Sequence, residues 1–176
     1  MADRGLTGVL LLGGASRRFG SPKALARLDG ETLAERCWRT LGEACDERLA
    51  VGKAVDALAL PFAVLDDGTD VRHPAAGIVA ALRAGRHDVC VVLPVDCPWM
   101  TPSALRALGD ACADAAWSEG PLPGAYRRSA LPTLERCLAE EGSIRAACAR
   151  LEVVTIALDA QLLTDVDTPD DLRSRL

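Results

Sequence analysis

The residues best suited to chemistry lie in one short segment near the start of the chain. Two adjacent glycines, Gly13 and Gly14, follow an apolar run, and the cations Arg17, Arg18 and Lys23 come soon after them. Glycines allow positive φ and bring backbone N–H groups close to a ligand, which creates an anion-binding concavity. The added positive charges predict a ligand with several negative charges, such as a nucleoside triphosphate. The alternative is a tight turn whose cations face water.

The spacing in this segment excludes two familiar phosphate-binding loops. The segment lacks the Gly-x-Gly-x-x-Gly pattern of dinucleotide-binding folds, and it lacks the Gly-Lys-Ser or Gly-Lys-Thr that closes a P-loop. Elsewhere, the two histidines, His73 and His87, have no nucleophile elbow near them, so a catalytic triad has no support. Arg127 and Arg128 either reach an acidic substrate or belong to a solvated loop.

Two aspartates are candidates for holding a metal ion. Asp96 follows an apolar run and lies between Pro94 and Pro98, so we expect its carboxylate at the carboxyl end of a strand. Open α/β sheets bind their ligands at that edge. Mg²⁺ prefers oxygen ligands and usually takes one or two protein carboxylates besides substrate phosphates, a number that Asp96 and Asp167 would supply. The alternatives are a turn role for Asp96 and a helix-capping role for Asp167.

The elements that must position these residues alternate along the chain. Short apolar runs alternate with longer amphipathic segments, which is typical of β-α units whose parallel strands are covered on both faces. The predicted strands are 8–12, 48–51, 62–65, 89–94 and 153–158, and the predicted helices are 32–44, 74–84, 103–113, 129–140, 143–149 and 169–176. Thr32 with Glu35 and Thr168 with Asp171 are predicted capping boxes. The fold class is α/β, with three layers (α/β/α) and a mostly parallel open sheet in a single domain, 1–176.

Composition narrows the class of protein further. The chain has 176 residues, of which 49% are apolar and 26% charged, and its net charge of −5 does not favour nucleic-acid binding. Its longest apolar runs reach about seven residues, well short of the ~20 that a membrane-spanning helix needs. The N-terminus lacks the features of a secretory signal, so we expect a cytoplasmic protein. The seven cysteines are an odd number without a Cys-x-x-Cys, which favours buried, reduced thiols.

Five segments carry a resemblance to a known family. Residues 11–23 read Leu-Leu-Gly-Gly-Ala-Ser-Arg-Arg-Phe-Gly-Ser-Pro-Lys, which resembles the Leu-x-Gly-Gly-x-Ser-Arg-Arg-x-Gly-x-x-Lys signature of the molybdopterin guanylyltransferase-like nucleotidyltransferases. Segments 73–78, 93–98, 121–132 and 165–172 are similar to further motifs of that family, in the same order. The resemblance implies a Rossmann-like nucleotidyltransferase sheet and a Mg²⁺-dependent reaction.

The resemblance also implies roles for individual residues. Arg18, Lys23 and Asp96 would be catalytic, with Arg18 and Lys23 on the triphosphate and Asp96 on the metal, together with Asp167. Asp66 fits best as the aspartate that contacts the nucleoside, with Asp67 as a close alternative, although both could be turn residues. The nucleotide-binding set would be Leu11, Leu12, Gly13, Gly14, Ser16, Arg18, Lys23, Asp66, Gly77 and Asp96.

The implied reaction is nucleotidyl transfer from GTP to the phosphate of molybdopterin, which releases pyrophosphate and forms molybdopterin guanine dinucleotide. Such a phosphate is already anionic, so no protein base is needed. Three departures leave the donor base open: Asp165 and Asp167 stand where guanine-specific members tend to have asparagines, His73 replaces a glycine, and a family asparagine corresponds to Gly52 or Lys53. The alternatives are a CTP-dependent molybdopterin cytidylyltransferase, an enzyme for another small phosphorylated metabolite, or a non-catalytic nucleotide-binding module. A monomer is the expected state.

Overall fold

The computed structural model describes residues 5–13 and 22–172, and every structural statement below concerns these residues. The predicted site residues Gly14, Ser16 and Arg18 lie outside them. Seven strands form one sheet in the order β5-β4-β1-β6-β8-β7-β9. The strands are β1 (Leu6–Leu11), β4 (Glu47–Gly52), β5 (Val64–Asp66), β6 (Val89–Pro94), β7 (Ala115–Trp117), β8 (Gly124–Arg127) and β9 (Val153–Thr155); β2 (Arg27–Leu28) and β3 (Glu31–Thr32) form a separate hairpin.

The sheet is parallel except at one strand. β5, β4, β1 and β6 run parallel to one another, and so do β7 and β9, whereas β8 is antiparallel to both β6 and β7. The helices are α1 (Leu33–Ala44), α2 (Pro74–Ala84), α3 (Pro102–Ala111), α4 (Leu131–Ala139) and α5 (Ile144–Ala147), with short 3₁₀ turns η1 (Lys23–Leu25), η2 (Ala54–Asp56), η3 (Arg128–Ala130) and η4 (Cys148–Arg150). The predicted α/β class with a mostly parallel sheet is confirmed.

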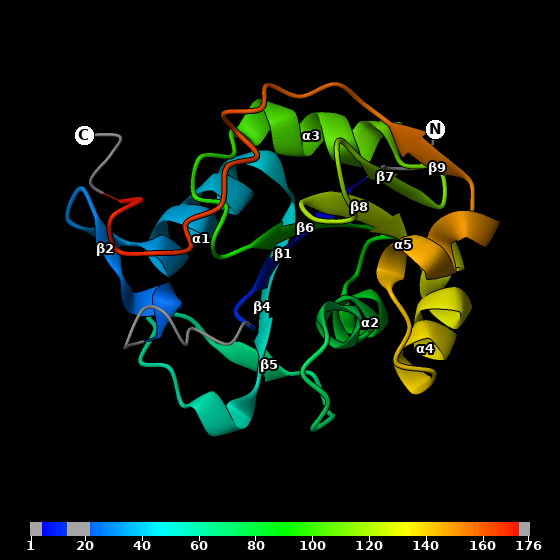
Figure 1. Cartoon of the computed structure of the whole chain (residues 1–176), viewed down its shortest axis with the longest axis horizontal. Coiled ribbons are helices and arrows are strands. Elements are labelled where there is room, and N and C mark those ends of the chain that lie inside the picture. Colours follow the sequence, from blue (N-terminus) through cyan, green and yellow to red (C-terminus); the bar gives the residue numbers. More distant parts are fainter. Residues whose placement is uncertain (1–4, 14–21, 173–176) are drawn as a thin grey trace.

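Helices cover both faces of the sheet, because the central strands are apolar on both. In β1, Leu6 and Leu10 pack in one buried cluster with α1 and α3, whereas Val9 and Leu11 pack in the other with α2 and α4. Successive side chains of a strand point to opposite faces, so a continuous apolar run supplies both clusters. Figure 1 shows α1 and α3 on one side of the sheet and α2, α4 and α5 on the other. The three predicted layers are therefore present.

Local signals set several helix starts. The Thr32 hydroxyl accepts a hydrogen bond from the Glu35 N–H (3.1 Å), and the Glu35 carboxylate accepts one from the Thr32 N–H (2.9 Å), which confirms the predicted capping box. α2 begins at Pro74 as predicted, and the His73 Nδ1 atom accepts a hydrogen bond from the Ala75 N–H (3.1 Å). This contact fixes His73 as the N-cap of α2 and fixes Nδ1 as an acceptor.

Other predicted elements differ from those observed. The sequence does not predict strands β7 and β8, because segments of three or four residues, one of them containing an arginine, do not stand out as apolar runs. The predicted strands 62–65 and 153–158 are shorter or shifted, at Val64–Asp66 and Val153–Thr155. The predicted helix 169–176 is wrong over 169–172, which form turns, and its last four residues lie outside the described chain. There the Asp171 carboxylate accepts a hydrogen bond from the Thr168 N–H (2.7 Å) and closes a single turn.

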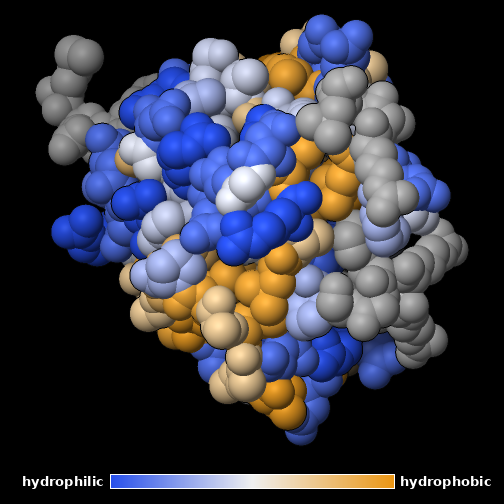
Figure 2. Space-filling view, turned by 90° about the vertical axis from the view of Figure 1, so that its left-hand side faces the viewer, coloured by the Kyte–Doolittle hydropathy of each residue, from blue (hydrophilic) through white to orange (hydrophobic). Residues whose placement is uncertain are grey.

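The cysteines and the surface agree with the composition. All seven cysteines are free thiols, and six of them are buried, so they act as small core residues. Within residues 5–13 and 22–172, every helix is too short or too polar to cross a bilayer. On the side of the molecule that carries β2, hydrophobic surface lies between hydrophilic side chains (Figure 2). The monomeric state and the cytoplasmic location stay predictions.

Candidate active site

The loops after β1 and β6 meet at the carboxyl edge of the sheet. The two strands are parallel neighbours whose register pairs Leu11 with Pro94, and the Val95 N–H donates to the Leu11 carbonyl (3.0 Å). Gly13 and Asp96 therefore follow directly on adjacent strands, as predicted from the two apolar runs. This edge is where open α/β sheets bind ligands.

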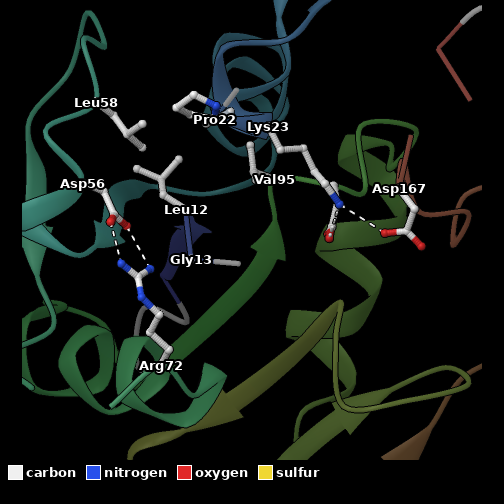
Figure 3. A pocket seen from close by; sticks show the side chains of 11 residues that line it. Leu12, Gly13, Pro22, Lys23, Asp56, Leu58, Arg72, Val95 and Asp167 are labelled. Carbon is white, nitrogen blue, oxygen red and sulfur yellow. Dashed lines mark hydrogen bonds and ion pairs between the residues drawn. The ribbon is translucent and has the colours of Figure 1, made fainter. Parts of the chain in front are cut away.

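One lysine links the candidate catalytic residues. Lys23 begins η1, and its Nζ atom lies 3.4 Å from Asp96 Oδ2 and 3.2 Å from Asp167 Oδ1. The Lys23 side chain is 14% exposed, whereas those of Asp96 and Asp167 are 33% and 63% exposed. Three residues separated by up to 144 positions are thus brought to one point, as predicted for Lys23, Asp96 and Asp167. Figure 3 shows the Lys23 amine directed at Asp167.

A third carboxylate belongs to this cluster and was missed. One ligand atom each from Asp96, Cys97 and Asp165 lie within 4.8 Å of one another. The Cys97 thiol donates to Asp165 Oδ1 (3.1 Å), and burial together with the charges of Asp96 and Asp167 raises the pKa of Asp165. The sequence signal for Asp165 is its Asp-x-Asp spacing with Asp167, and in the structure Val166 between them is fully buried.

The carboxylates fit a hard divalent cation such as Mg²⁺ better than a soft metal ion. Carboxylate oxygens are the ligands that Mg²⁺ prefers, and Asp96 with Asp165 or Asp167 supplies the usual number. Burial and the neighbouring Asp96 raise the pKa of the Cys97 thiol far above its ordinary value, so Cys97 is a protonated hydrogen-bond donor rather than a thiolate ligand. The Val166 N–H donates to the Asp96 carbonyl (2.8 Å), which ties the segment with Asp165 and Asp167 to the Asp96 loop.

Two adjoining cavities open at this edge and share the lining residues Gly13, Arg72 and Asp96. The first, of about 520 Å³, is also lined by Leu12, Pro22, Lys23, Ala24, Asp56, Leu58, Val95 and Asp167. The second, of about 390 Å³, is also lined by Leu11, Val51, Gly52, Lys53, Asp67, His73, Pro74, Gly77, Pro94, Cys97, Leu122 and Asp165. The first cavity holds the lysine and two of its carboxylates, and the second combines apolar lining residues with polar ones. Small-molecule sites generally have this composition.

Asp66 and Asp67 lie in different surroundings. The Asp66 carboxylate accepts hydrogen bonds from the N–H groups of Ala54 (2.6 Å) and Gly68 (2.7 Å), and these backbone donors lower its pKa. Asp66 thus holds a turn and is not part of the lining of either cavity. Asp67 lines the second cavity and forms an ion pair with Lys53 (2.7 Å).

Of the other predicted residues, Leu11 and Gly77 line the second cavity, Leu12 lines the first, and Gly13 lines both. A Cβ atom at Gly77 would lie 2.5 Å from Leu11 Cδ2, so a larger residue at this position would force the buried Leu11 side chain to move. Leu11 and Leu12 are buried, with 6% and 7% exposure. Gly13 has no described heavy atom within 4 Å of its Cβ position, which leaves space beside its backbone.

Arg72 is a further cavity residue that sequence reasoning missed. It lines both cavities, and its guanidinium binds the Asp56 carboxylate at 2.7 and 3.2 Å. In Figure 3 this pair lies across Gly13 from Lys23 and Asp167. An arginine in a loop after a weak edge strand carries no distinctive pattern, so only the fold reveals its place.

Arg127 and Arg128 do not belong to the site. Arg127 donates to the carbonyls of Cys112 and Ala113 (both 2.7 Å), and Arg128 donates to those of Gly85 (2.7 Å) and His87. Both arginines therefore hold loops at the amino end of β6. Neither a substrate contact nor a merely solvated loop describes them.

A mostly parallel sheet thus carries a lysine–carboxylate cluster beside two adjoining cavities at its carboxyl edge, which is where open α/β sheets bind their ligands. The model of the MobA-like NTP transferase domain matches residues 8–155, and the chain belongs to this family. It is a nucleotidyltransferase.

Relatives and solved structures agree with this assignment. A probable molybdenum cofactor guanylyltransferase from Chloroflexus aggregans is 31% identical, over 96% of this chain and 92% of the relative. A molybdenum cofactor guanylyltransferase from Desulfosudis oleivorans is 30% identical, over 95% and 92%. The crystal structure of molybdopterin-guanine dinucleotide biosynthesis protein A from Archaeoglobus fulgidus has a TM-score of 0.81 and 27% identity, over 96% of this chain and 95% of that one. A cytidylyltransferase from Thermus thermophilus, with a TM-score of 0.73 and 16% identity over 94% and 95%, shares the fold.

Proposed function

We propose that this enzyme transfers GMP from GTP to the phosphate of molybdopterin. An oxygen of the acceptor phosphate forms a bond to the α-phosphorus, the bond from that phosphorus to the bridging oxygen of the leaving group breaks, and pyrophosphate departs with both electrons. The observation that carries the proposal is that Lys23 and Asp96 open onto one cavity beside the Gly13 backbone. The names of the relatives support guanine as the base and molybdopterin as the acceptor.

Lys23 is proposed to bind the triphosphate. In the structure its ammonium lies between the carboxylates of Asp96 and Asp167. A phosphate oxygen offers the same negative charge as a carboxylate oxygen, so the leaving pyrophosphate can take the place of one of these partners. The charge that develops on the leaving group would then be neutralised by a lysine that is already in position. Arg18 has the same proposed role from the resemblance.

Asp96 is proposed to hold a divalent metal ion, with Asp165 or Asp167 as the second carboxylate. Nucleotidyltransferases of this kind generally use such an ion, and the oxygen-rich ligand set favours Mg²⁺. When bound, the ion would neutralise phosphate charge and act as a Lewis acid at the α-phosphate. The sequence pairs Asp96 with Asp167; Asp165 is supported as an alternative because one of its oxygens lies within 4.8 Å of a ligand atom of Asp96 and the Cys97 thiol donates to it.

Asp67, rather than Asp66, is proposed to contact the nucleoside. The Asp66 carboxylate is occupied by two backbone N–H groups, whereas Asp67 lines the second cavity together with Val51 and Gly77. The apolar residues that line that cavity suit a base, and its polar residues suit ribose hydroxyls. The nucleoside would then lie in the second cavity and the phosphates would extend past Gly13 into the first.

Turnover in this scheme requires alignment and charge neutralisation but no protein base. The acceptor phosphate is anionic at neutral pH, and His73 uses Nδ1 to cap α2. Holding two anions in line beside Lys23 and a bound metal ion would be the main task of such a site.

A panel of nucleoside triphosphates tests the proposal. The purified protein is incubated with Mg²⁺, molybdopterin and each of GTP, CTP, ATP and UTP, and pyrophosphate release is measured. We expect release with GTP, and the dinucleotide product should contain guanine. Release with CTP in place of GTP would support the cytidylyltransferase alternative, to which the Asp165 and Asp167 motif points. Nucleotide binding without any release would identify a non-catalytic module.

A further inference from the structure

Lys53 makes an unusual set of contacts directly after β4. Its Nζ atom donates to Asp67 Oδ1 (2.7 Å), to the Val71 carbonyl (2.8 Å) and to the Thr69 carbonyl. The side chains of Lys53 and Asp67 are each only 8% exposed. An ammonium group has three N–H donors, and three acceptors surround this one. Lys53 therefore uses its donors on the protein itself and has none to spare for a ligand.

The contacts of Lys53 join two segments that are distant in sequence but both reach the cavities. Segment 53–56 follows β4, and segment 66–72 follows β5. Two more links connect them: the Ala54 N–H donates to Asp66 (2.6 Å), and Arg72 binds Asp56 (2.7 Å). The two segments thus form one wall, which we call the clamp wall, and Lys53 is its most buried link.

The clamp wall carries the polar groups that face the proposed donor nucleotide. Asp67 lines the second cavity, Asp56 lines the first, and Arg72 lines both. Asp67 receives Lys53 and the Thr69 N–H (3.2 Å) on the same oxygen, Oδ1, so its carboxylate is fixed in orientation. Without the ammonium, a nearly buried carboxylate and two carbonyls lose their shared partner, and segment 67–72 has to rearrange to reach water.

We propose that Lys53 is a positioning residue for the donor nucleotide, because it holds Asp67 and Arg72 in the places from which they meet that ligand. The inference rests on the proposed function for the identity of the donor. In this scheme Lys53 acts on the donor, because both cavities that the clamp wall lines are assigned to the donor nucleotide. Lys53, one of the two residues that correspond to the family's asparagine, itself lines the second cavity and would act there through the groups that it holds.

Replacing Lys53 by methionine tests this role, because methionine keeps much of the apolar stem and removes the ammonium. For Lys53→Met we expect the Kd of GTP with Mg²⁺ and the KM for GTP to rise roughly 10-fold to 100-fold, the range for losing a hydrogen bond to a charged group. The KM for molybdopterin and the kcat at saturating GTP should stay within about 3-fold of wild type, since uniform binding is what is lost.

Arg128→Met is the matched control. Arg128 also holds two backbone carbonyls, those of Gly85 and His87, but at the other end of the sheet. It should lower the unfolding temperature without changing the Kd or KM of GTP. If Arg128→Met and Lys53→Met raised the Kd of GTP equally, the effect of Lys53 would be general destabilisation and the inference would be wrong.

Hydrogen exchange of the wild-type protein tests whether segment 67–72 meets the donor nucleotide, even where Lys53→Met does not fold. Addition of GTP and Mg²⁺ should increase protection of the amides in 67–72, and unchanged protection in that segment would overturn the inference. The two proposals can fail separately. If the wild-type protein binds GTP but releases no pyrophosphate, the proposed reaction is wrong. The ratio of the GTP Kd of Lys53→Met to that of wild type still tests the role of Lys53. If Lys53→Met is active and its Kd and KM for GTP equal those of wild type, the role of Lys53 is wrong and the proposed reaction stands.

Discussion

Cations at the two ends of the central strands have different partners and therefore different uses. At the amino end of β6, Arg127 and Arg128 donate to backbone carbonyls of the loops around them. At the carboxyl end, Lys23 faces two carboxylates at the edge of a cavity. A cation bound to carbonyls is fixed by the chain, whereas a carboxylate partner can be exchanged for a phosphate of similar charge. Arg127 also pairs with the Asp88 carboxylate (2.6 Å), but its two carbonyl partners belong to the chain and keep it in place, so the whole set of partners separates a structural cation from a functional one.

Lys53 lies between these two cases. It binds two carbonyls, as the arginines do, and one carboxylate at a cavity, as Lys23 does. By the same reasoning it is structural in its contacts and functional through what it holds. Variants at each end of the sheet test how far this distinction extends.

The largest effect is expected for Asp96. Asp96→Asn keeps the shape of the side chain but removes the charge that the metal ion needs, so kcat/KM should fall roughly 100-fold to 1,000-fold. Asp88→Asn is the matched control, because Asp88 forms an ion pair with Arg127 (2.6 Å) at the opposite end of β6. Steady-state pyrophosphate release measures both. A similar loss of activity in both variants would contradict the division between the two ends.

Lys23→Ala should produce the next largest effect. Loss of its charge from the leaving-group side lowers kcat by about 100-fold, while circular dichroism and the unfolding temperature stay near wild type. Arg127→Ala should show the reverse pattern: about 1–3 kcal/mol less stability, because two carbonyls lose a charged donor, and near-normal kcat. A Lys23→Ala enzyme with normal turnover would remove Lys23 from the proposed site.

The ease with which the sequence predicts a residue follows the same division. Asp96, Lys23 and the Thr32 capping box were predicted correctly in place, because each follows from a strong local pattern: a buried strand end, a glycine-rich segment, and an i, i+3 pair. Neither β7 nor β8 was predicted, since three or four residues paired mainly through the backbone leave no periodicity. The predicted C-terminal helix is wrong over 169–172, because the Asp171 carboxylate satisfies its capping contacts within one turn.

Site residues that depend on long-range packing could not be predicted in the same way. Arg72 reaches both cavities only because β5 lies beside β4 and the clamp wall holds its loop. The choice between Asp66 and Asp67 was open for the same reason, since adjacent residues differ only in which way the chain turns. Their different partners, backbone N–H groups for Asp66 and Lys53 for Asp67, appear only in the fold.

Two glycines distinguish packing from ligand contact at the carboxyl end itself. A Cβ at Gly77 meets Leu11 Cδ2 at 2.5 Å, so Gly77→Ala should lower the free energy of unfolding by about 1–3 kcal/mol, the usual cost of overpacking a core. Gly13→Ala meets no described atom within 4 Å and should leave stability unchanged. Its effect should appear only as a smaller thermal shift with GTP and Mg²⁺. Equal thermal shifts in Gly13→Ala and wild type would place the nucleotide away from the Gly13 backbone.

The smallest effect is expected far from the cavities, at Asp114, and it depends on pH. The Ser129 hydroxyl and then the Glu152 N–H donate to the Asp114 carboxylate and lower its pKa. A carboxyl whose pKa is lower in the folded state adds stability above its unfolded pKa, and this stability is lost as the pH falls through the folded value. The free energy of unfolding of wild type should therefore exceed that of Asp114→Asn by at most about 1 kcal/mol at pH 7, because solvent screens a carboxylate this exposed.

The difference between wild type and Asp114→Asn should shrink below about pH 4, where the carboxylate becomes protonated. Thermal unfolding of both proteins between pH 3 and pH 8 measures it. The kcat at pH 7 should be the same in both proteins. Asp114 joins the start of β7 to the segment before β9, and it lies at the end of the sheet opposite the cavities. A constant difference across that pH range would show that the contribution of Asp114 comes from shape rather than charge. A fall in the kcat of Asp114→Asn would show that structural contacts at this end of the sheet affect the geometry of the active site.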